Sequence, residues 1–168
     1  FARTHHVELV PCYDSPGHMF NTLNHPNYGY LREGTDTDAQ KAVINITHPD
    51  AYPLLRDLYG DLYRAFSSEI NYVSGDEALS IGTGTSKALA DEIGKANMFV
   101  GYLKKMREIS AEHGKRIAVA GDPFEPGFFK MFGLGNYGIE ALKQLPRDVI
   151  VGPWHYGDVP EFEFGETL

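Results

Sequence analysis

Residues 69–77 of this chain read EINYVSGDE, and residues 116–122 read RIAVAGD. Each is a short, mostly apolar run that stops at a glycine followed by an acid, which is typical of a buried strand and the turn after it. Between them, residues 87–113 carry apolar side chains at helical spacing, and Gly114 follows at a usual position for a helix C-cap. A strand, a long helix and a second strand in this order predict a parallel β-α-β unit.

The same pattern extends in both directions along the chain. Residues 6–13 and 148–152 also predict strands, a helix with its N-cap at Thr47 follows the first strand, and a shorter helix is expected over residues 139–145. The apolar runs are continuous, as in sheets that are buried on both faces. A doubly wound sheet and a barrel both fit, and a complete eightfold barrel needs about 250 residues. We therefore expect a parallel α/β fold, an incomplete (β/α) TIM barrel, as a single domain over residues 1–168.

The composition excludes several classes of protein. With 42% hydrophobic and 23% charged residues, the chain has the make-up of an ordinary globular domain. A formal net charge of -8 argues against a nucleic-acid partner, because phosphate binding needs a basic surface. Cys12 is the single cysteine, so no intramolecular disulfide can form. No apolar run approaches the roughly 20 residues of a membrane span. The chain begins without Met or a signal-like segment, and we expect it to be a piece of a longer polypeptide.

Polar and aromatic side chains gather where the predicted strands end. In a parallel barrel these ends meet on one face, and that face carries the active site. Two adjacent carboxylates leaving one strand point in different directions and can serve two parts of one substrate. The same pair would also suit a polar turn that opens a helix, and spacing alone does not decide between these interpretations. The candidate site residues are Asp14, His18, Asp76, Glu77, Asp122, Trp154 and Tyr156.

Three of these features have plainer interpretations. Trp154 suits stacking on a sugar ring, but a lone tryptophan more often fills a core. His18 could orient an acid or cap its own turn, and Asp122, before a proline, could be a turn residue only. The stretch GTGT at residues 82–85 lacks the Gly-Lys-Ser/Thr ending of a phosphate-binding loop, so a nucleotide site is not expected.

Several motifs together resemble glycoside hydrolase family 20, the β-N-acetylhexosaminidases. Residues 10–18, VPCYDSPGH, are similar to the third-strand motif of that family, and residues 44–52, INITHPDAY, to the segment that leads into its third helix. Residues 72–77, YVSGDE, resemble its fourth-strand Gly-Gly-Asp-Glu signature. Residues 145–151, LPRDVIV, with WHYG at 154–157, resemble its sixth strand and pocket tryptophan. The resemblance implies that the chain holds strands three to six of an eight-stranded barrel.

The resemblance also implies a retaining, substrate-assisted mechanism on N-acetylglucosamine or N-acetylgalactosamine glycosides, without metal or other cofactor. Glu77 would be the general acid and base, and Asp76 would hold the 2-acetamido group that attacks the anomeric carbon. His18 would lie behind Glu77, and Trp154 would line the acetamido pocket, with Asp14, Asp122 and Tyr156 as further substrate-binding candidates. A secreted or periplasmic protein would fit the same family.

The sequence departs from the family pattern in two places. Ser74 stands where the family often has glycine, and Gly121 stands where its fifth strand usually has tryptophan before an acid. The family's first-strand arginine and its seventh-strand tyrosine and aspartate lie outside this chain. Three alternatives therefore stay open: a non-catalytic carbohydrate-binding relative, a glycosidase acting on another 2-acetamido sugar, and a metal-dependent barrel hydrolase. The last would use Asp14, His18, Asp76 and Asp122 as ligands.

Overall fold

The centre of the molecule is one parallel sheet. The computed structural model describes residues 1–34, 42–78, 80–125 and 137–153 of the chain. Its strands lie side by side in chain order, β1-β2-β3-β4, and neighbouring strands are parallel. Their bounds are β1 (Cys12–Ser15), β2 (Ile70–Ser74), β3 (Arg116–Ala120) and β4 (Ile150–Gly152). Parallel neighbours need crossover connections, and the helices supply them.

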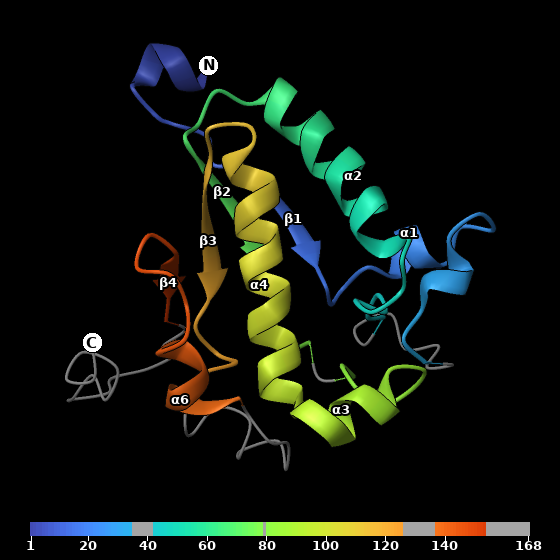
Figure 1. Cartoon of the computed structure of the whole chain (residues 1–168). Coiled ribbons are helices and arrows are strands. Elements are labelled where there is room, and N and C mark those ends of the chain that lie inside the picture. Colours follow the sequence, from blue (N-terminus) through green and yellow to red (C-terminus); the bar gives the residue numbers. More distant parts are fainter. Residues whose placement is uncertain (35–41, 79, 126–136, 154–168) are drawn as a thin grey trace.

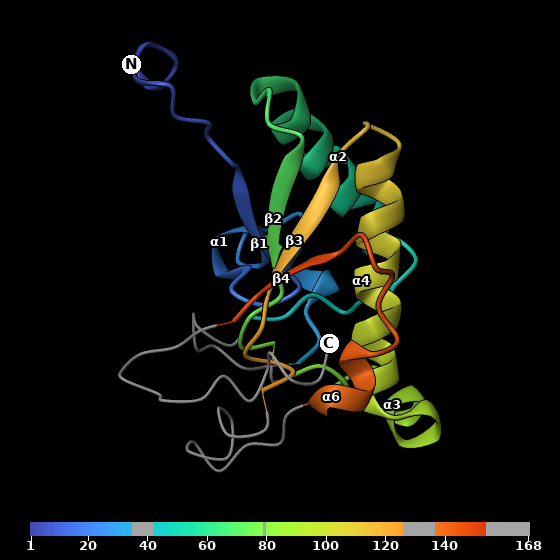
Figure 2. The ribbon, with the colours of Figure 1, turned by 90° about the vertical axis from the view of Figure 1, so that its left-hand side faces the viewer.

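The two long helices cover one face of this sheet. Figures 1 and 2 show α2 and α4 packed on the same side of the strands, with α3 and α6 at the end of the molecule toward which β2 and β3 point. Sequential strand order with the long helices on one side is the arrangement of a barrel wall, whereas a doubly wound sheet reverses its strand order and is covered on both sides. The helices are η1 (Ala2–His5), α1 (Phe20–Leu23), η2 (Gly29–Leu31), α2 (Ala51–Ala65), α3 (Lys87–Ile93), α4 (Lys95–Ala111) and α6 (Gly138–Leu142).

The strand predictions over residues 69–74 and 116–120 are confirmed. The strand expected over 148–152 and the helix expected over 139–145 are shorter, at Ile150–Gly152 and Gly138–Leu142. Three other expectations are wrong. The first strand begins at Cys12, because η1 and an irregular segment occupy the residues before it. The helix after β1 takes Asp50 as its N-cap position, since the Thr47 hydroxyl donates to Asn45 Oδ1 instead. The long helix expected over 87–113 is two helices, α3 and α4. In the part of the chain described, no helix has the length and apolarity needed to span a membrane.

Helix α4 supplies the middle of the core. The Phe99 ring is fully buried and stacks on Tyr137, with ring centroids 4.6 Å apart and planes at 24°. Phe99 also lies 5.8 Å from the Phe124 ring, which belongs to the turn after β3. On the sheet, Val73 and Val119 have 0% exposure and face the helices. The core therefore joins the helix layer directly to the turns that follow β2 and β3.

Gly94 separates the two helices because its backbone is one that side-chain-bearing residues avoid, with φ 85° and ψ 142°. We expect Gly94→Ala to lower the free energy of unfolding by about 1–3 kcal/mol. Gly101 is the matched control, since it lies within α4 with open space where a Cβ would be. Gly101→Ala should be neutral or stabilise by up to about 1 kcal/mol. Thermal unfolding of the two variants of the whole protein checks this, and equal shifts would contradict it.

Candidate active site

The chain turns sharply after β2, at the acid pair. Ser74, Gly75 and Glu77 have φ values of 67°, 79° and 45°. Left-handed backbone is uncommon for residues other than glycine and tends to concentrate at functional sites. In this turn the Ser74 hydroxyl donates a hydrogen bond to Asp76 Oδ1, and Asp76 is 9% exposed. The Glu77 side chain is 38% exposed. The turn thus holds one nearly buried carboxylate and one accessible carboxylate at the end of β2.

His18 lies against both carboxylates. Its Nε2 atom is 3.2 Å from Asp76 Oδ2 and 3.5 Å from Glu77 Oε2. His18 comes from the turn after β1 and is itself left-handed, with φ 53°. His18 is far in the sequence from the adjacent residues Asp76 and Glu77. The fold therefore brings these three predicted site residues together at the ends of two neighbouring strands.

Two local features let the His18 turn approach β2. Gly17 packs against the second turn so closely that a Cβ there would lie 3.1 Å from the Asp76 carbonyl oxygen. On its other side, the turn is tied to residues 42–44, since Ile44 N donates to Pro16 O at 2.9 Å and Met19 N donates to Ala42 O at 3.0 Å. The glycine of this turn is thus needed for a close approach of the backbones.

Asp122 lies beneath Glu77. It follows β3, has 0% exposure, and its Oδ2 accepts a hydrogen bond from the Glu77 backbone N–H at 3.1 Å. Burial raises the pKa of Asp122 to about 7; the Glu77 N–H bond opposes that shift, and the neighbouring charges of Asp76 and Glu77 add to it. Asp122 therefore contacts the backbone of the acid pair from the side of the next strand.

Tyr137 supports the same turn from the segment before α6. Its hydroxyl donates to the Ala78 carbonyl oxygen at 2.8 Å, and its ring stacks on Phe99. Burial raises the pKa of Tyr137 beyond its ordinary range, with the Asp122 charge contributing. The turn of residues 74–78 is consequently held by Asp122, which follows β3, and by Tyr137, which precedes α6.

A cluster of buried hydroxyls fixes the end of β1 to the helix layer. Ser15 Oγ is hydrogen-bonded to Tyr59 Oη at 2.7 Å and to Tyr102 Oη at 2.6 Å. Tyr59 also donates to the Tyr13 carbonyl oxygen at 2.7 Å. Burial raises the pKa of both tyrosines well above the usual value, so both are neutral hydroxyls. The strand that leads to His18 is thereby attached to α2 and α4 together.

The remaining predicted site residues have different outcomes. Asp14 is exposed on β1, where Cys12 Sγ donates to its Oδ1 at 3.4 Å. Its neighbours Tyr13 and Ser15 both contact Tyr59 of α2 instead. Asp14 thus lies on the face of the sheet away from the long helices. Trp154 and Tyr156 lie outside the described residues.

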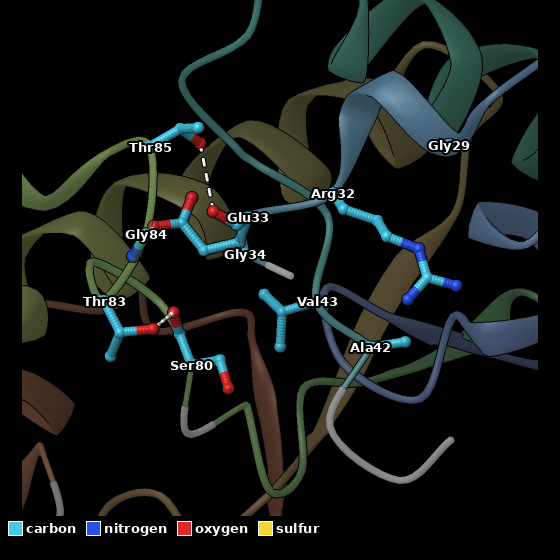
Figure 3. A pocket seen from close by; sticks show the side chains of 10 residues that line it. All are labelled: Gly29, Arg32, Glu33, Gly34, Ala42, Val43, Ser80, Thr83, Gly84 and Thr85. Atoms are coloured by element: carbon cyan, nitrogen blue, oxygen red, sulfur yellow. Dashed lines mark hydrogen bonds between the residues drawn. The ribbon is translucent and has the colours of Figure 1, made fainter. Parts of the chain in front are cut away.

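A cavity of about 730 Å³ lies beside the acid turn, between residues 29–34 and 42–43 on one side and residues 80–85 on the other (Figure 3). Glu33, 1% exposed, forms its inner wall. Glu33 Oε1 accepts hydrogen bonds from Gly84 N at 3.0 Å, Ser86 N at 3.2 Å and Ser86 Oγ at 2.6 Å. Thr85 N donates to the Glu33 carbonyl oxygen at 2.8 Å. These amides already bind an internal carboxylate and a carbonyl, so the GTGT stretch offers no cradle for a phosphate.

The ligand set of the metal-dependent alternative is not assembled. Across residues 1–34, 42–78, 80–125 and 137–153, no three side chains of His, Cys, Asp or Glu are grouped so that they could hold a metal ion. His18 and Asp76 are close, whereas Asp14 and Asp122 make the separate contacts described above.

The Glu33 contacts and the Ser15–Tyr59–Tyr102 cluster were missed by sequence reasoning. Each joins residues at least 44 positions apart, as in the Ser15–Tyr59 pair. Tyr59 belongs to an apolar helical stripe and gives no local sign that its hydroxyl reaches a strand end. Only the position of Ser15, inside the motif of residues 10–18, marked it as part of the site region.

Comparison with known families shows which family the chain belongs to. Its sequence matches glycosyl hydrolase family 20, catalytic domain, over residues 1–159. This chain belongs to glycosyl hydrolase family 20. The family assignment covers both turns of the candidate site, including His18 and the Asp76–Glu77 pair. Among curated protein sequences no significant match is found.

Several solved structures share the fold. The chain superposes on the exo-β-N-acetylglucosaminidase of Vibrio harveyi in complex with N-acetylglucosamine with TM-score 0.66 and 17% identity, covering 92% of this chain and 24% of that one. Dispersin B superposes with TM-score 0.61 and 18% identity, covering 95% of this chain and 41% of that one. The β-N-acetylhexosaminidase of Streptomyces coelicolor A3(2) superposes with TM-score 0.59 and 21% identity, covering 91% of this chain and 26% of that one. The predicted (β/α) TIM barrel, present in part, is confirmed. The chain spans about a quarter of the Vibrio and Streptomyces proteins.

Proposed function

We propose that the protein carrying this chain is a retaining glycosidase that removes 2-acetamido-2-deoxy-β-hexosyl residues by substrate-assisted catalysis. Membership of glycosyl hydrolase family 20 supports this class of reaction. The observation that carries the proposal is the grouping of His18 with the two carboxylates, at 3.2 Å from Asp76 and 3.5 Å from Glu77. Of the solved structures named above, the Streptomyces coelicolor protein is a β-N-acetylhexosaminidase, and the exo-β-N-acetylglucosaminidase of Vibrio harveyi holds N-acetylglucosamine.

The two acids differ in exposure in the way that the two roles require. Glu77, the accessible carboxyl, donates its proton to the glycosidic oxygen as the bond to the anomeric carbon breaks. The carbonyl oxygen of the substrate's own acetamido group attacks the same carbon, which gives an oxazolinium intermediate. Asp76, nearly buried, accepts the acetamido N–H and stabilises the positive charge that develops there.

The second half of the reaction returns the enzyme to its starting state. Glu77, now ionised, takes a proton from water as the water oxygen bonds to the anomeric carbon and the oxazolinium ring opens. Two displacements at one carbon leave its configuration unchanged. His18 orients the carboxylates from behind, and Asp14, Trp154 and Tyr156 are proposed to contact the sugar.

A pair of substrates tests the proposal. With the whole protein, an aryl N-acetyl-β-glucosaminide should be hydrolysed, whereas the matching aryl β-glucoside, which lacks the internal nucleophile, should react at least about 10³-fold more slowly in kcat/KM, since intramolecular attack carries a large advantage. Release of the aryl group measures both rates. Equal rates on the two substrates would show that the acetamido group is not the nucleophile.

One observation favours a second candidate, a carbohydrate-binding relative without catalysis. Gly121 cannot carry an aromatic side chain, because a Cβ there would lie 2.8 Å from Pro153 Cα and 3.0 Å from the Gly152 carbonyl oxygen. Residue 121 therefore cannot supply the aromatic side chain that the family usually has at this position. Calorimetric binding of N-acetylglucosamine without turnover of any aryl glycoside, and unchanged in Glu77→Gln, would support this candidate over the first.

A further inference from the structure

We propose that Asp122 is a positioning residue that holds the backbone of Glu77 in the conformation from which its carboxyl reaches the substrate. The inference rests on the proposed function for its catalytic consequence. Its structural basis is the hydrogen bond from Glu77 N to Asp122 Oδ2, 3.1 Å long, which crosses from the turn after β2 to the turn after β3.

Glu77 needs such a contact because its backbone is unfavourable on its own. At φ 45° it lies in the left-handed region, which is unfavourable for a side-chain-bearing residue. Conformations of this kind persist only when surrounding contacts determine them. A buried carboxyl oxygen that accepts the amide proton of Glu77 is such a contact.

Asp122 is itself held firmly enough to serve this purpose. Gly121 N donates to the Gly152 carbonyl oxygen at 2.8 Å, which ties the turn to β4. Within the turn, Phe124 N donates to Gly121 O at 2.9 Å and Glu125 N donates to Asp122 O at 3.3 Å. The Phe124 ring is fully buried beside Phe99. The turn after β3, held by these contacts, therefore gives Asp122 a fixed position from which it binds the turn after β2.

The surroundings of Asp122 favour positioning over contact with substrate. With 0% exposure, its side chain lies under the Glu77 backbone rather than on an open surface. The ionisable groups around it are Asp76, Glu77 and Tyr137, with His18 beyond the two acids and Glu125 in its own turn. Since burial raises the pKa of Asp122 to about 7, the group is partly neutral near pH 7, and asparagine is its closest mimic.

Two substitutions of Asp122 in the whole protein test the inference. Asp122→Ala removes the acceptor, and we expect kcat on an alkyl 2-acetamido-β-glucoside, whose departure needs the proton of Glu77, to fall about 10–100-fold with KM changed less than about threefold. Asp122→Asn keeps an oxygen that can accept the Glu77 N–H and should recover most of that loss. Amide hydrogen exchange in the peptide over residues 74–78 should be slow in the wild type and in Asp122→Asn, and fast in Asp122→Ala.

Asp148→Ala is the matched control, because Asp148 is an exposed acid that pairs with Arg107 at the start of β4. It should change neither kcat nor exchange at residues 74–78. Unaltered kcat and exchange in Asp122→Ala, or equal losses in the Ala and Asn variants, would overturn the inference. An inactive wild type would instead overturn the proposed function, and hydrogen exchange would then decide whether Asp122 holds Glu77.

Discussion

Glu77→Gln is expected to lower kcat/KM for an alkyl 2-acetamido-β-glucoside by about 10²–10⁴-fold, the usual contribution of a general acid. Glutamine keeps the shape of the side chain but cannot deliver a proton to the departing oxygen. The loss should be much smaller for an aryl glycoside whose phenolate leaves without protonation, because the first step then needs no acid. Measuring both substrates with the whole protein separates a lost proton donor from a general disturbance of the site.

Glu69→Gln provides the control for this substitution. Glu69 is an exposed glutamate immediately before the other end of β2, so the chemical change is the same at a point remote from His18. We expect its kcat/KM to match the wild type on both substrates. A loss in Glu77→Gln that is equal for the good and the poor leaving group would contradict the role of Glu77 as the acid.

Asp76→Asn is expected to lower kcat on N-acetyl substrates by about 10²–10³-fold, the cost of removing one preorganised electrostatic contact. The amide oxygen of asparagine can still accept the hydrogen bond from Ser74 Oγ that Asp76 Oδ1 accepts. The other oxygen, 3.2 Å from His18 Nε2, becomes an NH₂ group. That group can neither accept the acetamido N–H nor offset positive charge on the oxazolinium ring, so the fold is kept while the chemistry is lost.

Asp57→Asn makes the same change at an exposed position of α2 and should leave kcat unchanged. If Asp76→Asn retained more than about a third of the wild-type kcat, a role for Asp76 in stabilising a charged transition state would be ruled out, because such contacts are worth far more.

The strands and the acid pair could be predicted because their signals are local. Residues 70–74 and 116–120 are short apolar runs with a glycine and an acid directly after them, and both form strands within one residue of the expected bounds. A buried strand is specified by its own side chains, and in a parallel sheet the position after its carboxyl end belongs to the site face. Asp76, Glu77 and His18 were predicted as site residues in this way.

Features that depend on a partner far along the chain were decided by the tertiary structure alone. The late start of β1 depends on which residues find a neighbour in β2. The burial of Asp122 under the Glu77 amide joins residues 45 positions apart. Local sequence thus determined β2, β3 and the kinds of residues at the site. The packing of distant segments determined their contacts, since hydrogen bonds and burial are properties of pairs and not of single positions.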